Sequence, residues 1–214
     1  MNMFNDYITF WQEKYEIILE YALQHIVMSF VAIVVAVVFS VPLATYMTKM
    51  RSNKIKNIIF NIANVFQTIP TIAMFALMVP FLGIGFKPAV VALFLYALLP
   101  LLRNTYTGMK AIDPTILEAA KGMGFSSLQR IVKVEVPLAL PYIMSGVRMT
   151  TVYIISWTTL AAVVGAGGLG ALVISGIGFN DKHMIFTGTI LAILMALFID
   201  LIFARVEKYF IKNN

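Results

Sequence analysis

The sequence of 214 residues contains no cysteine and few charged residues. The absence of cysteine excludes a disulfide-stapled secreted domain and any thiol chemistry. Asp, Glu, Lys and Arg make up only 12% of the chain, whereas hydrophobic residues make up 60%, and the mean hydropathy is +0.88. Such a balance is atypical of disordered, fibrous and soluble chains, so it argues strongly against a water-soluble enzyme.

Long uncharged runs predict five membrane-spanning helices, because a hydrocarbon core of about 30 Å is crossed by about 20 residues of helix. The expected spans are residues 26–46, 57–86, 88–106, 141–164 and 183–203. The second run is too long for one straight span, and Pro70 is expected to break it because proline removes a backbone donor. The glycine-rich stretch 165–178 is expected to be a re-entrant or closely packed segment, too flexible for a robust helix. The sequence therefore predicts an all-α, polytopic membrane protein in which residues 1–214 form a single transmembrane domain.

Lys and Arg residues are distributed unequally between the loops, and this distribution predicts the orientation in the membrane. With the N-terminus outside, thirteen of the sixteen lie on the cytoplasmic side, as the positive-inside rule requires. We therefore expect an external N-terminal segment over residues 1–24, a C-terminus in the cytoplasm and no signal peptide. Because the basic residues are scattered through short loops, no nucleic-acid partner is expected.

The one long hydrophilic loop, residues 110–137, is expected to carry two short helices on the cytoplasmic side. Asp113 followed by Pro114 is typical of a helix start, and Gly124 of a helix end. Ser126 and Gln129 fit a capping box that begins the second helix. Three of its apolar residues share one face and Pro137 is expected to end it; those three are Leu128, Ile131 and Val134. The loop is therefore expected to dock onto an intracellular partner.

Residues of this loop resemble the EAA loop of bacterial ABC-importer permeases. Glu118-Ala119-Ala120 is followed after three residues by Gly124 and after nine more by Val134-Glu135-Val136-Pro137. The family pattern is EAA, three residues, Gly, nine residues and Ile-x-Leu-Pro, so Val134 and Val136 stand for Ile and Leu. Residues 67–70 (Gln-Thr-Ile-Pro) and 165–170 (Gly-Ala-Gly-Gly-Leu-Gly) look like those of permeases for quaternary-ammonium osmoprotectants.

The resemblance implies a type I ABC importer (MetI-like) permease fold in a bacterial cell membrane, with glycine betaine, carnitine or choline as substrate. It also implies three partners: a second permease subunit, identical or homologous, a cytoplasmic ABC ATPase dimer, and an external substrate-binding protein. No Walker A pattern occurs in the chain, so ATP hydrolysis is expected in a separate subunit, with no catalytic, cofactor or metal site here. The ATPase-coupling residues implied by the resemblance are Glu118, Ala119, Ala120, Gly124, Leu128, Ile131, Val134 and Pro137.

Aromatic side chains in the spans are candidates for the transport pathway, since ring faces attract quaternary ammonium groups. Packing against lipid or other helices remains the alternative for each of them. The candidate pathway residues are Phe66, Pro70, Phe75, Tyr96, Tyr153 and Trp157.

The remaining polar signals are assigned no chemistry. Gly165-x-Gly167-x-x-Gly170 matches a dinucleotide-binding fingerprint but lacks the strand that must precede it. His25 and His183 are expected at the membrane interfaces, without a metal.

Ionisable residues near the ends of the spans bear on the alternative functions. Asp200 is expected to pair with Arg205 or Arg103, with a proton relay as the alternative, and Arg148 to reach the cytoplasmic interface. An ion-coupled secondary transporter would need ionisable groups at mid-membrane, and only Asp200 is a candidate. Import of another small solute, such as an amino acid, and a purely structural membrane protein remain open alternatives.

Overall fold

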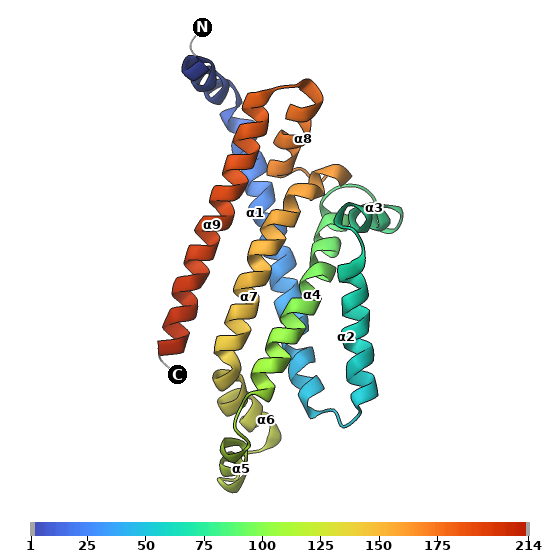
Figure 1. Ribbon diagram of the computed structural model, residues 1–214, viewed down its shortest axis with the longest axis vertical. Coiled ribbons are helices and arrows are strands. Elements are labelled where there is room, and N and C mark those ends of the chain that lie inside the picture. Colours follow the sequence, from blue (N-terminus) through green and yellow to red (C-terminus); the bar gives the residue numbers. More distant parts are fainter. Residues whose placement is uncertain (1–2, 213–214) are drawn as a thin grey trace.

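The computed structural model describes residues 3–212, and every regular element within that range is helical (Figure 1). The elements are α1 (Met3–Lys49), α2 (Asn53–Thr68), α3 (Thr71–Leu82), α4 (Phe86–Lys110), α5 (Pro114–Gly122), α6 (Ser127–Arg130), the π-helical turn η1 (Ile131–Glu135), α7 (Val136–Thr158), the 3-10 turn η2 (Thr159–Val164), α8 (Leu169–Phe179) and α9 (Lys182–Lys212). Four helical stretches are long and apolar enough to cross a membrane, and the bent pair α2 and α3 makes five if it is counted as one span. The prediction of an all-α polytopic membrane protein is confirmed.

The second span is broken at Pro70, as the sequence predicts. Ile69 is extended and Pro70 precedes α3, so α2 and α3 meet at 102°. Because a proline restricts the preceding residue to extended backbone, the helix ends before Ile69. Figure 1 shows α3 turned across the end of α2.

Helix α4 lies at the centre of the bundle, packed between α1 and α7 with α2 and α3 at its other side (Figure 1). Two glycines let α4 and α7 approach closely: a Cβ on Gly108 would lie 2.4 Å from the Tyr142 Cβ, and one on Gly146 would lie 2.6 Å from the Asn104 Cβ. Such small-residue contacts are a common means of helix association in membranes. The apolar core between α1, α3, α4 and α7 includes Phe75 and Leu93.

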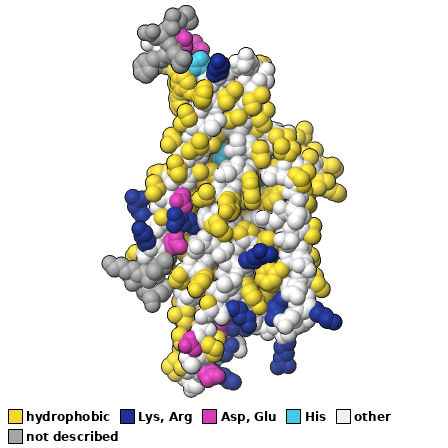
Figure 2. All heavy atoms as spheres, viewed as in Figure 1, with side chains coloured by type: hydrophobic (Ala, Val, Ile, Leu, Met, Phe, Trp, Pro, Cys, Tyr) yellow, Lys and Arg dark blue, Asp and Glu magenta, His cyan; other side chains and the backbone are white. Residues whose placement is uncertain are grey.

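The outer surface of the bundle suits a lipid environment. Figure 2 shows hydrophobic side chains over much of the visible face, and most of the visible Lys and Arg in the half of the molecule that carries α5 and α6. Helix α9 exposes most of its apolar side chains, including Ile193, Leu197 and Leu201. Exposed apolar surface on this scale fits hydrocarbon better than water.

Helix α1 runs unbroken from Met3 to Lys49, so the N-terminal segment and the first span form one helix. Two expectations about the course of the helices are wrong. The stretch after residue 168 does form a regular helix, α8, since its glycines are held by close contacts, as Gly176 is by Ile185. Pro137 does not end a helix: it lies in the first turn of α7, where proline is tolerated, and η1 joins α6 to α7 so that the fourth span begins well before residue 141.

Candidate ATPase-coupling module

Asp113 caps the start of helix α5, within the segment that we name the coupling module, residues 110–137. The Asp113 carboxylate accepts hydrogen bonds of 2.8 Å from both the backbone amide and the hydroxyl of Thr115, and Pro114 occupies the first helical position. Both hydrogen bonds lower the pKa of the Asp113 carboxyl below its usual value, and the bond from the backbone amide has the larger effect. The ionised carboxylate therefore caps the helix, as the sequence predicts.

Helix α5 ends in a glycine turn that folds the chain back toward α6. The Phe125 amide donates to the Ala120 carbonyl (3.2 Å) and the Gly124 amide to the Lys121 carbonyl (3.0 Å), which is the Schellman pattern. Gly124 has φ +81°, a left-handed conformation that favours glycine over other residues. The spacing between Ala120 and Gly124 is thus the spacing that this turn requires.

The capping box predicted for α6 is present. The Ser126 amide donates to the Gln129 side chain (2.9 Å), and the Gln129 amide donates to the Ser126 hydroxyl (3.3 Å). After only four residues α6 passes into η1, whose wider turn shifts the positions of the side chains that follow. The two short helices, α5 and α6, project beyond the spans at one end of the molecule (Figure 1).

The three residues of the expected apolar stripe differ in exposure. Leu128 is 70% exposed, whereas Ile131 and Val134 are half-buried against the bundle, as is Pro137. Of the EAA residues, Glu118 and Ala119 are exposed, and Ala120 is buried beneath the turn. Glu118 makes no ion pair with any residue in 3–212, so its carboxylate faces solvent.

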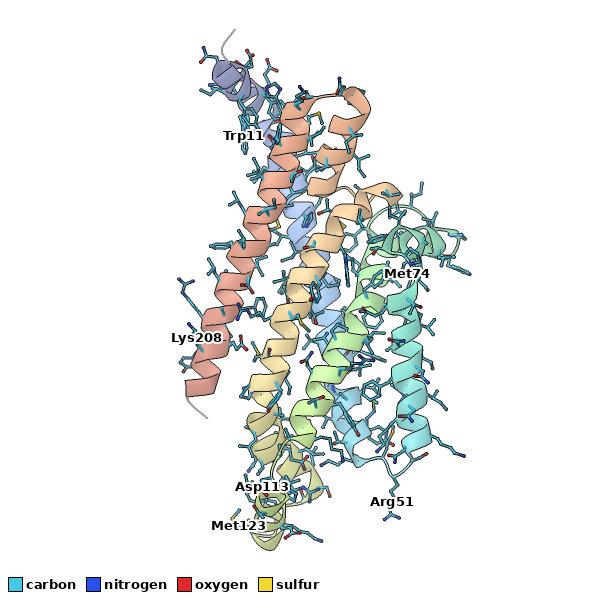
Figure 3. All side chains as sticks on the ribbon, in the orientation of Figure 1. Trp11, Arg51, Met74, Asp113, Met123 and Lys208 are labelled. Carbon is cyan, nitrogen blue, oxygen red and sulfur yellow. The ribbon has the colours of Figure 1, made fainter. Side chains whose placement is uncertain are left out.

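The sequence did not single out three apolar residues that the structure exposes beside Leu128. Met123 is 69% exposed and lies at the tip of the module (Figure 3), and Val132 and Ile116 are also exposed. Each is an apolar residue within a polar loop, which is the signal that would have identified it. With Leu128 they are the large apolar side chains that the module exposes.

A buried carboxylate joins the module to the first span. The Glu135 side chain is 2% exposed and accepts a hydrogen bond of 2.8 Å from Arg130 Nε at its Oε1 atom, while its Oε2 atom accepts one from Lys49 Nζ. Lys49 is the last residue of α1, and Arg130 is the last of α6. Sequence reasoning missed Glu135, although a charged residue between Val134 and Val136 is unusual at an apolar helix end.

Three of the candidate pathway residues lie together. The Trp157 ring is 4.8 Å from the Tyr96 ring and 5.9 Å from the Tyr153 ring, between centroids. The Tyr96 hydroxyl donates to the Ile69 carbonyl beside the break at Pro70 (2.5 Å). Tyr96 is buried, Trp157 is half-buried and Tyr153 is 47% exposed, so the three form an aromatic row that reaches the surface of α7.

The other three candidate pathway residues lie apart from this row. Phe75 is fully buried in the core, and Phe66 is half-buried against it. Pro70 is exposed at the break between α2 and α3. Within residues 3–212, no group of three or more His, Asp or Glu side chains is placed to hold a metal.

Asp200 forms an ion pair, but not with the expected partner. The Arg148 guanidinium holds it by two hydrogen bonds of 2.7 and 2.9 Å and also donates to Glu207 (3.0 Å). Arg103 and Arg205 are both exposed and form no ion pair with Asp200. Two carboxylates of α9 therefore neutralise the Arg148 guanidinium.

His25 is wholly buried, which corrects the expectation of an interfacial residue. Its Nδ1 atom accepts from the Leu169 amide (3.3 Å), and its Nε2 atom lies 2.9 Å from the Ile155 carbonyl. The ring therefore ties α1 to α7 and to the start of α8. His183 is only partly buried: it stacks on Phe10 and lies 3.5 Å from the Asp181 carboxylate.

The five-span fold with a helical module between the third and fourth spans defines a class of transport protein. Residues 36–213 match the model of the family described as binding-protein-dependent transport system inner membrane component, and the chain belongs to this family. It is thus a non-catalytic membrane permease subunit of an ABC importer, in which the ATPase is a separate subunit. The family resemblance and the absence of enzymatic activity are confirmed.

Curated relatives and solved structures cover almost the whole chain. The chain is 38% identical over 200 residues to the carnitine transport permease protein OpuCB of Listeria monocytogenes, covering 94% of this chain and 91% of the relative. It is 40% identical over 185 residues to the choline transport system permease protein OpuBB of Bacillus subtilis, covering 86% and 84%. The fold matches a chain of the inward-facing MetNI methionine ABC transporter with a TM-score of 0.83 at 23% identity, covering 92% of this chain and 98% of that one.

Proposed function

We propose that the chain is the permease subunit of an ATP-driven importer of quaternary-ammonium osmoprotectants, such as glycine betaine, carnitine or choline. The observation that carries this substrate class is the 38–40% identity to permeases named for carnitine and choline transport, over nearly the full length of both chains. The relatives for methionine are similar in fold, but at a lower identity of 23%. The osmoprotectant class is therefore preferred to amino acids.

In the proposed complex the coupling module binds a cytoplasmic ATPase, and an external binding protein delivers the substrate at the other end. Leu128 and Met123 supply exposed apolar anchors for an ATPase groove, and Glu118 supplies a free carboxylate. The N-terminal half of α1 lies at the opposite end of the molecule from the module (Figure 3). This arrangement supports an external N-terminus and a cytoplasmic module, since most of the visible Lys and Arg lie in the half of the molecule that carries the module (Figure 2).

The proposed pathway runs along the aromatic row and is completed by a second permease subunit. Tyr153 and Trp157 present ring faces beside Tyr96, which suits the diffuse charge of a quaternary ammonium group. The ion pair of Asp200 with Arg148 supports ATP-driven transport over ion coupling, because the carboxylate is already neutralised by a guanidinium.

The proposal is tested by reconstituting the chain with its permease partner, ATPase and binding protein in liposomes. We expect ATP hydrolysis to be stimulated by glycine betaine together with the binding protein, and Leu128→Asp to abolish retention of the ATPase. Asn53→Asp is the matched control, because it also adds a single negative charge at an exposed position, at the start of α2 and outside the module. Stimulation by methionine alone, or retention of the ATPase by Leu128→Asp, would contradict the proposal.

A further inference from the structure

Glu135 is the only charged residue whose side chain is fully buried within the described part of the chain. Burying a carboxylate costs several kcal/mol unless cations and hydrogen bonds compensate it. Here both oxygens are occupied, one by Arg130 and the other by Lys49. The ion triad Lys49–Glu135–Arg130 is therefore complete. Loss of either cation would leave the buried negative charge of Glu135 with one compensating cation instead of two.

The triad connects parts of the chain that are far apart in sequence. Arg130 ends α6, Glu135 ends η1, and Lys49 lies 86 positions before Glu135 at the end of α1. Helices α5 and α6 pack chiefly on each other and on η1 rather than on the spans. A movement of the module consequently reaches the bundle along two routes. One is the backbone, which continues from η1 into α7, and the other is the ion pair of Glu135 with Lys49, which leads to α1.

The connecting element is also suited to movement. A π-helical turn such as η1 is rare and is often found at functional positions. A groove bordered by Lys49, Ile131 and Val136 separates α1 from this turn on one side, with a volume of about 330 Å³. Apolar packing between η1 and the end of α1 is thus incomplete, which leaves the ion pair as a main link between them.

We infer that Glu135 is a positioning residue that transmits movement of the coupling module to the first span through Lys49. This inference rests on the proposed function, in which an ATPase moves the module. The triad makes the end of α1 follow α6, so that α1 and α7 tilt together when the ATPase closes. Without the link to Lys49, the ATPase still docks and hydrolyses ATP, but α1 no longer follows.

The test measures glycine betaine uptake per ATP hydrolysed in the reconstituted complex. We expect Lys49→Met to keep the ATPase bound and active while uptake per ATP falls about tenfold, a typical size for coupling between sites. Lys49→Arg retains the cation and should restore the ratio to within about twofold of the original. Lys54→Met is the matched control, because Lys54 is an exposed lysine of the next helix without an ion pair within residues 3–212, and it should leave the ratio unchanged.

A double-variant cycle separates transmission from a general loss of stability. Glu135→Gln combined with Lys49→Met should lower the ratio no further than either change alone, since both remove the same link. The inference is overturned if Lys49→Met transports at the original ratio, or if the losses of the two changes multiply. Should Glu135→Gln fail to fold, Lys49→Met still decides the matter, because the Lys49 side chain is 32% exposed. Failure of the proposed function would look different: the unchanged complex would show no stimulated hydrolysis at all.

Discussion

Gly170→Ala should disrupt the packing of α8, although the substitution is small and favours a helix. A Cβ on Gly170 would lie 1.7 Å from the Thr159 carbonyl oxygen and 2.6 Å from its carbon. Moving the oxygen contact out to 3.0 Å, the shortest that real Cβ atoms show, requires a displacement of 1.3 Å between α8 and η2. Because the obstacle is backbone rather than a flexible side chain, we expect a cost of about 1–3 kcal/mol.

Gly178→Ala, in the same helix, is the matched control. No atom lies within 4 Å of a Cβ at Gly178, so the change adds only helix propensity and should stabilise the protein by up to about 1 kcal/mol. The assay is thermal unfolding in detergent, followed by the fluorescence of the two tryptophans, of which Trp157 lies in α7 just before η2. Gly170→Ala should lower the melting temperature and Gly178→Ala should not. Equal melting temperatures would refute the argument from close approach.

Two further substitutions test the ion pair between the spans and the cap of α5. Arg148→Gln should lower the melting temperature more than Arg103→Gln, measured side by side, because it leaves the Asp200 carboxylate unpaired whereas Arg103 is exposed. Equal effects would contradict a structural role for the pair. The lowered pKa of Asp113 means that its ionised form stabilises α5 above the usual Asp value, about 3.9, and that this stabilisation is lost as the pH falls through the lowered pKa. Asp113→Asn should keep the cap without this pH dependence. Hydrogen exchange of the Thr115 amide should therefore differ between the original protein and the variant only in acid. An equal pH dependence of this exchange in both proteins would show that the Asp113 carboxylate does not cause it.

Local sequence signals were sufficient where one short segment determines the structure. The cap at Asp113, the turn at Gly124 and the break at Pro70 each depend on backbone preferences within a few residues, and each is present. The five spans follow equally directly from the length of the uncharged runs.

Features that depend on contacts distant in sequence were not predictable in the same way. The buried position of His25 requires Leu169 and Ile155 on other helices, and the partner of Asp200 is decided by how α7 packs on α9. Glycine propensity alone argued against α8, because close packing of Gly170 on η2 cannot be seen in the sequence. Likewise, the π turn at η1, which changes the helical period after Ile131, has no signal in the sequence.

The central claim, that the coupling module meets an ATPase in the cytoplasm, is tested most directly by its accessibility in intact cells. The chain contains no cysteine, so single cysteines can be introduced at Met123, in the module, and at Glu13, near the other end, without further changes. Both positions are exposed, and both would react with a membrane-impermeant maleimide wherever the reagent can reach. The account predicts that Glu13→Cys is labelled in intact cells. In cells that make the chain without its ATPase, Met123→Cys should be labelled only after the membrane is permeabilised. Labelling of Met123→Cys in intact cells would contradict it, because a module on the outer face cannot bind a cytoplasmic ATPase.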